Sequence, residues 1–63
     1  MSQLNIIRVL VVDDHPVVRQ GLVAMLEEAP DILVIGQAGN GEEALAVFRQ
    51  KQPDATLMDL RMP

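Results

Sequence analysis

An aliphatic run near the start of the chain restricts the fold more than any other feature. Residues 6–12 read Ile-Ile-Arg-Val-Leu-Val-Val, and only Arg8 interrupts the apolar side chains. A strand with one face in water alternates apolar and polar residues, whereas an unbroken apolar run is typical of a strand covered on both faces. The run therefore predicts a buried strand of a parallel sheet.

The stretch after this run predicts an amphipathic helix. Asp14-His15-Pro16 is a helix-start signal, with Asp14 as an acidic candidate N-cap and a proline near the first turn. His15 is expected to have a surface or capping role. Ala29-Pro30 ends the helix. Apolar side chains recur at helical spacing and define the face expected to be buried: Val18, Leu22, Met25 and Leu26.

A strand, a helix and a further strand follow. Residues 32–38 and 55–58 are strand candidates, and Met58 is expected in the core. Between them, Asn40 followed by Glu43 resembles a capping box. The inner face of that second helix is expected to comprise Ala44, Leu45, Val47 and Phe48. The predicted order is β-α-β-α-β, without repeats or linkers.

Alternating strands and helices predict an α/β fold with a parallel sheet. Connections between parallel strands are right-handed. If the two helices cover opposite faces, the strand order becomes 2-1-3. A ligand crevice is then expected between strands one and three, at their carboxyl ends.

Three aspartates fall at those strand ends. Asp13 and Asp14 follow the first strand, and Asp59 follows the third. Oxygen ligands without sulfur or imidazole favour a hard cation such as Mg²⁺, and aspartate is a nucleophile for phosphoryl transfer. Alternatively, Asp14 is only an N-cap and Asp59 only a polar residue after a strand, although the three acids together favour a site.

Composition narrows the function classes. Sixty-three residues allow one small domain, and the lack of cysteine fits a reducing compartment. No signal peptide and no apolar stretch near the roughly 20 residues of a membrane span are present, which predicts a soluble, cytoplasmic protein without a membrane partner. The net charge of −4, five scattered basic residues and a single Phe48 argue against nucleic-acid binding by this segment.

Two motifs closely resemble the receiver domain of two-component response regulators. They are Val-Val-Asp-Asp-His-Pro-Val-Val-Arg-Gln-Gly-Leu at 11–22 and Asp-Ala-Thr-Leu-Met-Asp-Leu-Arg-Met-Pro at 54–63. The Asp-Asp-His-Pro opening is similar to the NarL/FixJ group, whose receiver precedes a LuxR-type helix-turn-helix domain. The resemblance covers the whole chain. It implies a flavodoxin-like three-layer α/β fold, truncated here to β-α-β-α-β with strand order 2-1-3.

The resemblance also implies roles for individual residues. Asp59 would be the phosphoacceptor. Asp14 would bind Mg²⁺ directly, Asp13 through water, and the backbone carbonyl of Arg61 would be a further ligand, so that the metal set comprises Asp13, Asp14, Asp59 and Arg61. The phosphoryl donor would be a phosphohistidine on a sensor histidine kinase or a small acyl phosphate. The chain would be a phosphoacceptor and not an enzyme.

The chain is expected to be shorter than a complete receiver domain. Residues 1–63 would form a partial receiver, without the later Ser or Thr and Lys that contact the phosphoryl group, and without the C-terminal domain through which the protein would contact DNA. An exposed third strand would favour a homodimer. Two alternatives stay open: a self-associating structural fragment without phosphoryl chemistry, and a Mg²⁺-dependent phosphatase, although Arg61 stands where that class has a second acid.

Overall fold

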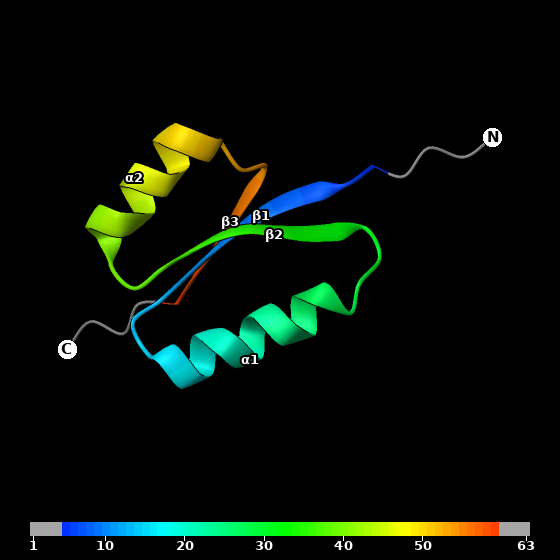
Figure 1. Cartoon of the computed structure of the whole chain (residues 1–63), viewed down its shortest axis with the longest axis horizontal. Coiled ribbons are helices and arrows are strands. Elements are labelled where there is room, and N and C mark those ends of the chain that lie inside the picture. Colours follow the sequence, from blue (N-terminus) through cyan, green and yellow to red (C-terminus); the bar gives the residue numbers. More distant parts are fainter. Residues whose placement is uncertain (1–4, 60–63) are drawn as a thin grey trace.

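The computed structural model describes residues 5–59 and confirms the predicted order of elements (Figure 1). The strands form a single parallel sheet in the order β2-β1-β3. The predicted α/β class and the 2-1-3 strand order are therefore confirmed. In chain order the elements are β1 (Ile7–Asp13), α1 (Pro16–Glu27), β2 (Ile32–Ala38), α2 (Gly41–Lys51) and β3 (Ala55–Asp59).

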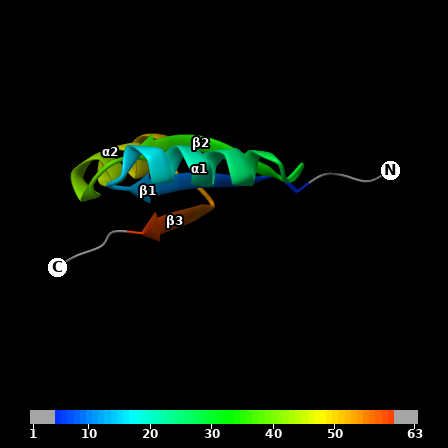
Figure 2. The ribbon, with the colours of Figure 1, turned by 90° about the horizontal axis from the view of Figure 1, so that it is seen from below.

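The two helices lie on opposite sides of the sheet, with α2 above and α1 below it in Figure 1. Both pack against β1 and β2, and neither packs against β3, which Figure 2 shows beyond β1 at the edge of the sheet. Right-handed connections require this arrangement for the 2-1-3 order. The strand β1 is consequently covered on both faces, while β3 is an open edge. No helix among residues 5–59 is long and apolar enough to cross a membrane.

The core is built around β1. Four consecutive aliphatic residues of this strand are at most 6% exposed, from Val9 to Val12. Leu10 and Val12 form the core cluster with Ala38 of β2 and Ala44 of α2. Burial of an uninterrupted run on both faces is what the sequence of β1 predicts for a central parallel strand.

The predicted inner face of α1 is rotated in the structure. Met25 is 69% exposed, and so its assignment to the core was wrong; Val18 is also exposed. Residues of a helix are offset by about 100°, and the partly buried positions of α1 centre on Leu26 and Arg19. The side chain of Arg19 thus lies on the inner face of α1, and Met25 lies outside that face. Met58 was also wrongly placed in the core, since it is 54% exposed on the uncovered strand β3.

The start of α2 confirms the predicted capping box. Asn40 is the N-cap, and its Oδ1 accepts a hydrogen bond of 2.8 Å from the backbone N–H of Glu43. The carboxylate of Glu43 in turn accepts from the N–H of Gly39 at 2.7 Å, one residue before the usual partner. These two bonds fix the loop between β2 and α2.

The end of α2 is fixed by a side chain from β1. Gln52 closes the helix in the left-handed conformation, with φ of 48°. The guanidinium of Arg8 donates hydrogen bonds to the carbonyls of Lys51 and Gln52. A cation at this end of a helix is favourable because the last carbonyls carry partial negative charge. Arg8 is also bonded through its N–H to the carboxylate of Asp54, which joins β1 to the start of β3.

A bulge interrupts the pairing of β1 with β2. Val9 pairs with Val34, but Leu10 pairs with Gly36, so Ile35 is the extra residue. The Nζ of Lys51 donates a hydrogen bond of 2.9 Å to the carbonyl of Ile35. At Gly36, α2 lies so close that a Cβ would be 2.7 Å from Cγ1 of Val47.

Replacing Gly36 with Ala is expected to lower the free energy of unfolding by about 1–3 kcal/mol, because the new methyl overlaps a stiff β-branched side chain. Urea unfolding followed by circular dichroism measures the effect. Gly21→Ala is the matched control, because nothing lies within 4 Å of a Cβ at that position of α1. The control should gain stability by up to about 1 kcal/mol. Equal unfolding midpoints for both variants would mean that α2 moves off the sheet at no cost.

Candidate metal centre

The backbone register brings two of the predicted site residues together. Asp13 at the end of β1 pairs with Asp59 at the end of β3, Cα against Cα, in neighbouring parallel strands. Such strands lie about 4.8 Å apart, and so the predicted meeting of these two strand ends is confirmed. The structure describes Asp59 through its backbone, and the predicted carbonyl ligand Arg61 lies outside the described residues.

Asp13 is a buried acid with a defined orientation. Its side chain is 1% exposed, and Oδ1 accepts a hydrogen bond of 2.8 Å from the backbone N–H of His15. A carboxylate in such a place is costly unless other groups bond to it. The bond to His15 is an Asx-type turn, which directs the chain out of the sheet and into α1.

Asp14 lies beside Asp13 and is open to solvent. Its side chain is 43% exposed, and Oδ1 lies 2.8 Å from Nδ1 of His15. The prediction that Asp14 caps α1 was wrong: the N-cap is His15, whose side chain makes no capping bond. Since Pro16 already occupies the first helical position, Asp14 stands one residue too early to cap the helix. The carboxylate of Asp14 therefore remains accessible.

The donor set suits a hard divalent cation. Asp13, Asp14 and His15 each offer a ligand atom, and these atoms lie within 4.8 Å of one another. Carboxylate oxygens favour Mg²⁺, which takes one or two carboxylates and keeps several waters, whereas imidazole suits softer metals. One buried and one accessible carboxylate, next to the strand end that carries Asp59, fit the predicted Mg²⁺. The imidazole of His15 would then stay outside the ligand set as a partner of Asp14.

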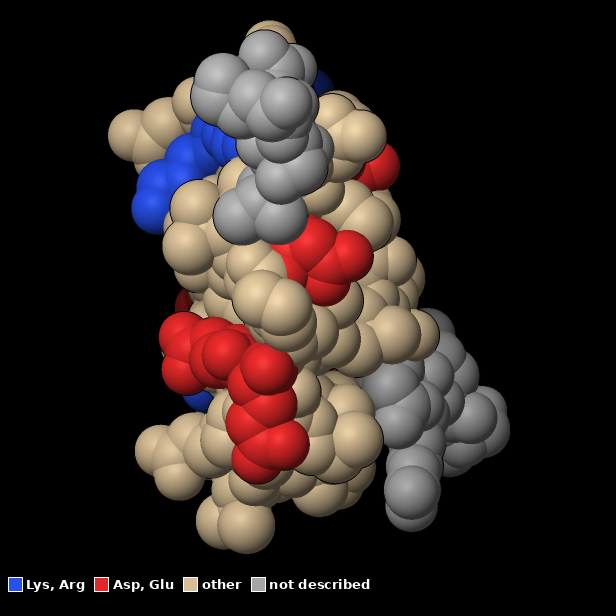
Figure 3. Space-filling model, turned by 90° about the vertical axis from the view of Figure 1, so that its right-hand side faces the viewer, with Lys and Arg blue, Asp and Glu red and all other residues tan. Residues whose placement is uncertain are grey.

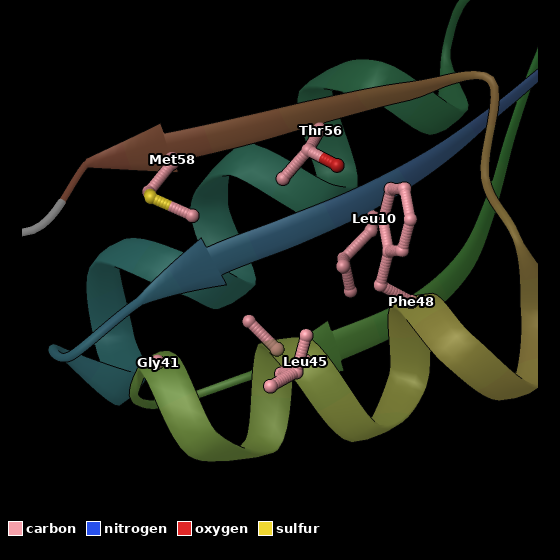
Figure 4. Close-up of a pocket in the computed structure, with 7 residues that line it drawn as sticks. Leu10, Gly41, Leu45, Phe48, Thr56 and Met58 are labelled. Carbon is pink, nitrogen blue, oxygen red and sulfur yellow. The ribbon is translucent and has the colours of Figure 1, made fainter.

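An apolar groove lies apart from this cluster, between α2 and β3. Its volume is about 310 Å³. Side chains of α2 and β3 converge on the space beside Leu10 (Figure 4). Because none of the lining residues is charged, the groove is no candidate for the chemistry of phosphoryl groups. The lining comprises Leu10, Gly41, Ala44, Leu45, Phe48, Thr56 and Met58.

Charged side chains on the face seen in Figure 3 occur in separate patches. Acidic side chains lie at the lower left and at the centre of this view, and basic ones gather mainly at the upper left. Among the described residues visible on this face, the basic ones form no broad surface of the kind that binds the phosphates of a nucleic acid.

The family model for the response regulator receiver domain matches residues 9–63. The chain belongs to this family. The family that the two sequence motifs indicated is thereby confirmed, and the β-α-β-α-β unit is receiver structure.

The relatives of the chain include NarL, which confirms the group that the Asp-Asp-His-Pro opening indicated. It is 53% identical over 57 residues to the response regulator GacA of Pseudomonas viridiflava, covering 90% of this chain and 27% of that protein. It is 41% identical over 63 residues to the nitrate/nitrite response regulator NarL of Escherichia coli K12, covering 100% and 29%. A protein-glutamate methylesterase/protein-glutamine glutaminase of Nitrosospira multiformis is 53% identical over 57 residues, covering 90% and 16%.

A solved structure agrees with the fold. The two-component response regulator of the LuxR family from Aurantimonas sp. SI85-9A1 superposes with a TM-score of 0.84 at 38% identity, covering 92% of this chain and 41% of that one. The receiver thus resembles LuxR-type regulators in both sequence and structure. The chain spans less than a third of the length of GacA, NarL and the methylesterase. The last of these is an enzyme by name.

The sequence patterns missed one residue beside the acidic cluster. Arg19 of α1 donates a hydrogen bond of 2.9 Å from Nη1 to the backbone carbonyl of Asp13. A helical projection could have found it, because Arg19 falls between Leu22, Val23 and Leu26, and all four are partly buried. A cation on the inner face of a helix needs a partner, and the nearest strand end offers one.

Proposed function

We propose that this chain is the phosphoacceptor part of a two-component response regulator, in which Asp59 accepts the phosphoryl group and Asp13 and Asp14 hold Mg²⁺. The observation that carries the proposal is the pairing of Asp13 with Asp59 across β1 and β3. It brings the accepting residue to the buried carboxylate and, through the next peptide, to the accessible one.

The chemistry is one displacement at phosphorus. An oxygen of the Asp59 carboxylate forms a bond to phosphorus, and the bond from phosphorus to the donor nitrogen or oxygen breaks, which leaves an acyl phosphate on Asp59. Mg²⁺, when bound, neutralises charge on the phosphoryl oxygens. Asp13, held by the N–H of His15, provides a fixed carboxylate, and Asp14 provides one that an ion can reach from solvent. The backbone carbonyl of Arg61 is proposed as a further ligand.

The wider proposal concerns the whole protein. The donor is a phosphohistidine of a sensor histidine kinase, and the remaining receiver elements and a C-terminal output domain complete a cytoplasmic regulator of transcription. The Asp-Asp-His-Pro opening and the LuxR-family relative support a DNA-binding output, through which alone the protein contacts DNA. The chain itself is a phosphoacceptor and not an enzyme. The comparisons match receivers and lend no support to a phosphatase or a purely structural fragment.

A homodimer is part of the proposal. The edge strand β3 is covered by neither helix, and Leu57 and Met58 are 40% and 54% exposed. An uncovered aliphatic edge recruits a second strand. Pairing of β3 with its copy would satisfy that edge in the simplest two-fold arrangement. Sedimentation of this chain as a folded monomer would contradict it.

Metal dependence tests the central claim. The protein is incubated with a small acyl phosphate and Mg²⁺, and intact-mass spectrometry follows the uptake. One phosphoryl group per chain is expected, and uptake should fall to background when a chelator removes the metal, because the charge of the incoming phosphoryl group would then meet two uncompensated carboxylates. Restoring Mg²⁺ in excess over the chelator should restore uptake. Uptake that ignores the chelator would contradict the role of Asp13 and Asp14.

A further inference from the structure

Arg19 contacts the metal centre from the inner face of α1. Its Nη1 donates to the backbone carbonyl of Asp13 at 2.9 Å. That carbonyl belongs to the peptide between Asp13 and Asp14. Because a peptide unit is planar, a bond to its oxygen restricts the direction in which the backbone of Asp14 leaves β1. The N–H of His15 meanwhile holds the Asp13 carboxylate, so that separate donors fix the side chain and the carbonyl of one residue.

The guanidinium also lies close to the backbone of Gly39. A Cβ on Gly39 would lie 3.0 Å from Nη1 of Arg19 and 3.5 Å from Oε1 of Glu43. The backbone at Gly39 is itself held by Glu43, which accepts its N–H at 2.7 Å. Arg19 therefore lies between the carboxyl end of β1 and the loop after β2, and the absence of a side chain at Gly39 leaves room for it.

Arg19 makes fewer bonds than a structural arginine in such a place would. Its Nε is buried and has no hydrogen-bond partner among residues 5–59. No carboxylate whose position is described forms an ion pair with it. A partly buried cation with an unmet donor costs free energy. What the guanidinium does secure is one carbonyl at the acidic site, and its charge opposes the repulsion between the neighbouring carboxylates.

We propose that Arg19 is a positioning residue for the metal site. By bonding the Asp13 carbonyl against the loop at Gly39, it orients the peptide that carries Asp14 and so brings the two carboxylates into the geometry that a single Mg²⁺ requires. The inference rests on the proposed function, since it assumes that Asp13 and Asp14 are the ligands. It adds a residue outside the acidic cluster that sets the affinity of the site.

The test measures Mg²⁺ binding to the full-length protein that carries these residues. Calorimetry gives the dissociation constant for Mg²⁺ alone, and thermal melting gives the increase in Tm that saturating Mg²⁺ produces. Arg19→Gln removes the forked donor, and Gly39→Ala adds a methyl 3.0 Å from Nη1, which shifts the guanidinium by a few tenths of an ångström while Arg19 itself is kept. Both variants are expected to bind Mg²⁺ about 10-fold more weakly, as is usual when a group that orients a metal ligand is lost. Arg19→Lys keeps the charge and a single donor nitrogen and should recover part of the affinity.

Gly21→Ala is the control, because it adds the same methyl in α1 where a Cβ meets nothing within 4 Å. It should bind Mg²⁺ as the unaltered protein does. If Arg19 has only a structural role, Arg19→Gln and Gly39→Ala will lower the Tm equally with and without Mg²⁺, and the dissociation constant will not change. That result would overturn the inference and leave the proposed function intact. If the unaltered protein binds no Mg²⁺, the metal site itself is wrong and the inference fails with it. Should Arg19→Gln not fold, Gly39→Ala and Arg19→Lys decide the question.

Discussion

Replacing Asp59 with Asn is expected to reduce phosphoryl uptake from an acyl phosphate to background. An amide oxygen is a far weaker nucleophile than a carboxylate and cannot form the acyl phosphate. The fold should survive, because Asn has nearly the shape of Asp and the strand β3 is held through its backbone pairing with β1. Intact-mass spectrometry after incubation with the acyl phosphate and Mg²⁺ measures the uptake.

Asp54→Asn is the matched control for this substitution. Asp54 precedes β3 at its opposite end, and Oδ2 accepts a hydrogen bond of 2.9 Å from the N–H of Arg8, a bond that an Asn oxygen can also accept. This variant should take up one phosphoryl group, as the unaltered protein does. Full uptake by Asp59→Asn would place the accepting group elsewhere, and the exposed carboxylate of Asp14 would then be the first to test.

Replacing Leu10 with Ala is expected to remove about half or more of the free energy of unfolding and to lower the melting temperature accordingly. Leu10 is 1% exposed and lies in the core cluster with Val12, Ala38 and Ala44. A buried Leu→Ala change costs about 2–5 kcal/mol. A chain of 63 residues has a total free energy of unfolding of about 3–9 kcal/mol, so that this single cavity consumes most of it. Thermal melting followed by circular dichroism measures the loss.

Leu33→Ala separates the effect of burial from that of the chemical change. Leu33 lies on the neighbouring strand β2 and is 54% exposed, so the same truncation should change the free energy of unfolding by about 0.5 kcal/mol or less. Similar losses for both variants would mean that Leu33 is covered in solution, for example by a second copy of the chain. A small loss for Leu10→Ala would mean that the groove beside it closes when the side chain is removed.

Structural features that follow from a sequence pattern or from the fixed handedness of connections could be predicted from the sequence. The uninterrupted apolar run of β1 predicted a strand covered on both faces, and right-handed connections then required the order β2-β1-β3. The adjacency of Asp13 and Asp59 followed from that order alone, before any family resemblance was considered. The capping box of Asn40 and Glu43 was equally predictable, because its partners lie three residues apart in the sequence.

Contacts that depend on the rotation of an element could not be predicted in the same way. The apolar pattern of α1 does not fix how the helix is rotated about its own axis. In the structure, the side that faces the sheet includes Arg19 and does not include Met25. The partner of Arg19 is a backbone carbonyl, and every residue has one, so the sequence carries no sign of which carbonyl is bonded. The cap of α1 was missed for a related reason: the Asp13 carboxylate turns the chain, and the helix begins one residue later than Asp14 would require.

The position of β1 at the centre of the sheet has a consequence for synthesis of the protein. Among the described strands β1 is made first and β3 last, and the residues that join them, Arg8 and Asp54, are 46 positions apart. At about 5–20 residues per second, a ribosome needs roughly 2–9 s to add that stretch. Throughout that interval, the edge of β1 that pairs with β3 in the finished sheet has no partner. Unpaired strand edges of this kind bind other strands. The segment that is least exposed in the finished molecule is thus the one most open to mispairing while the molecule is being made.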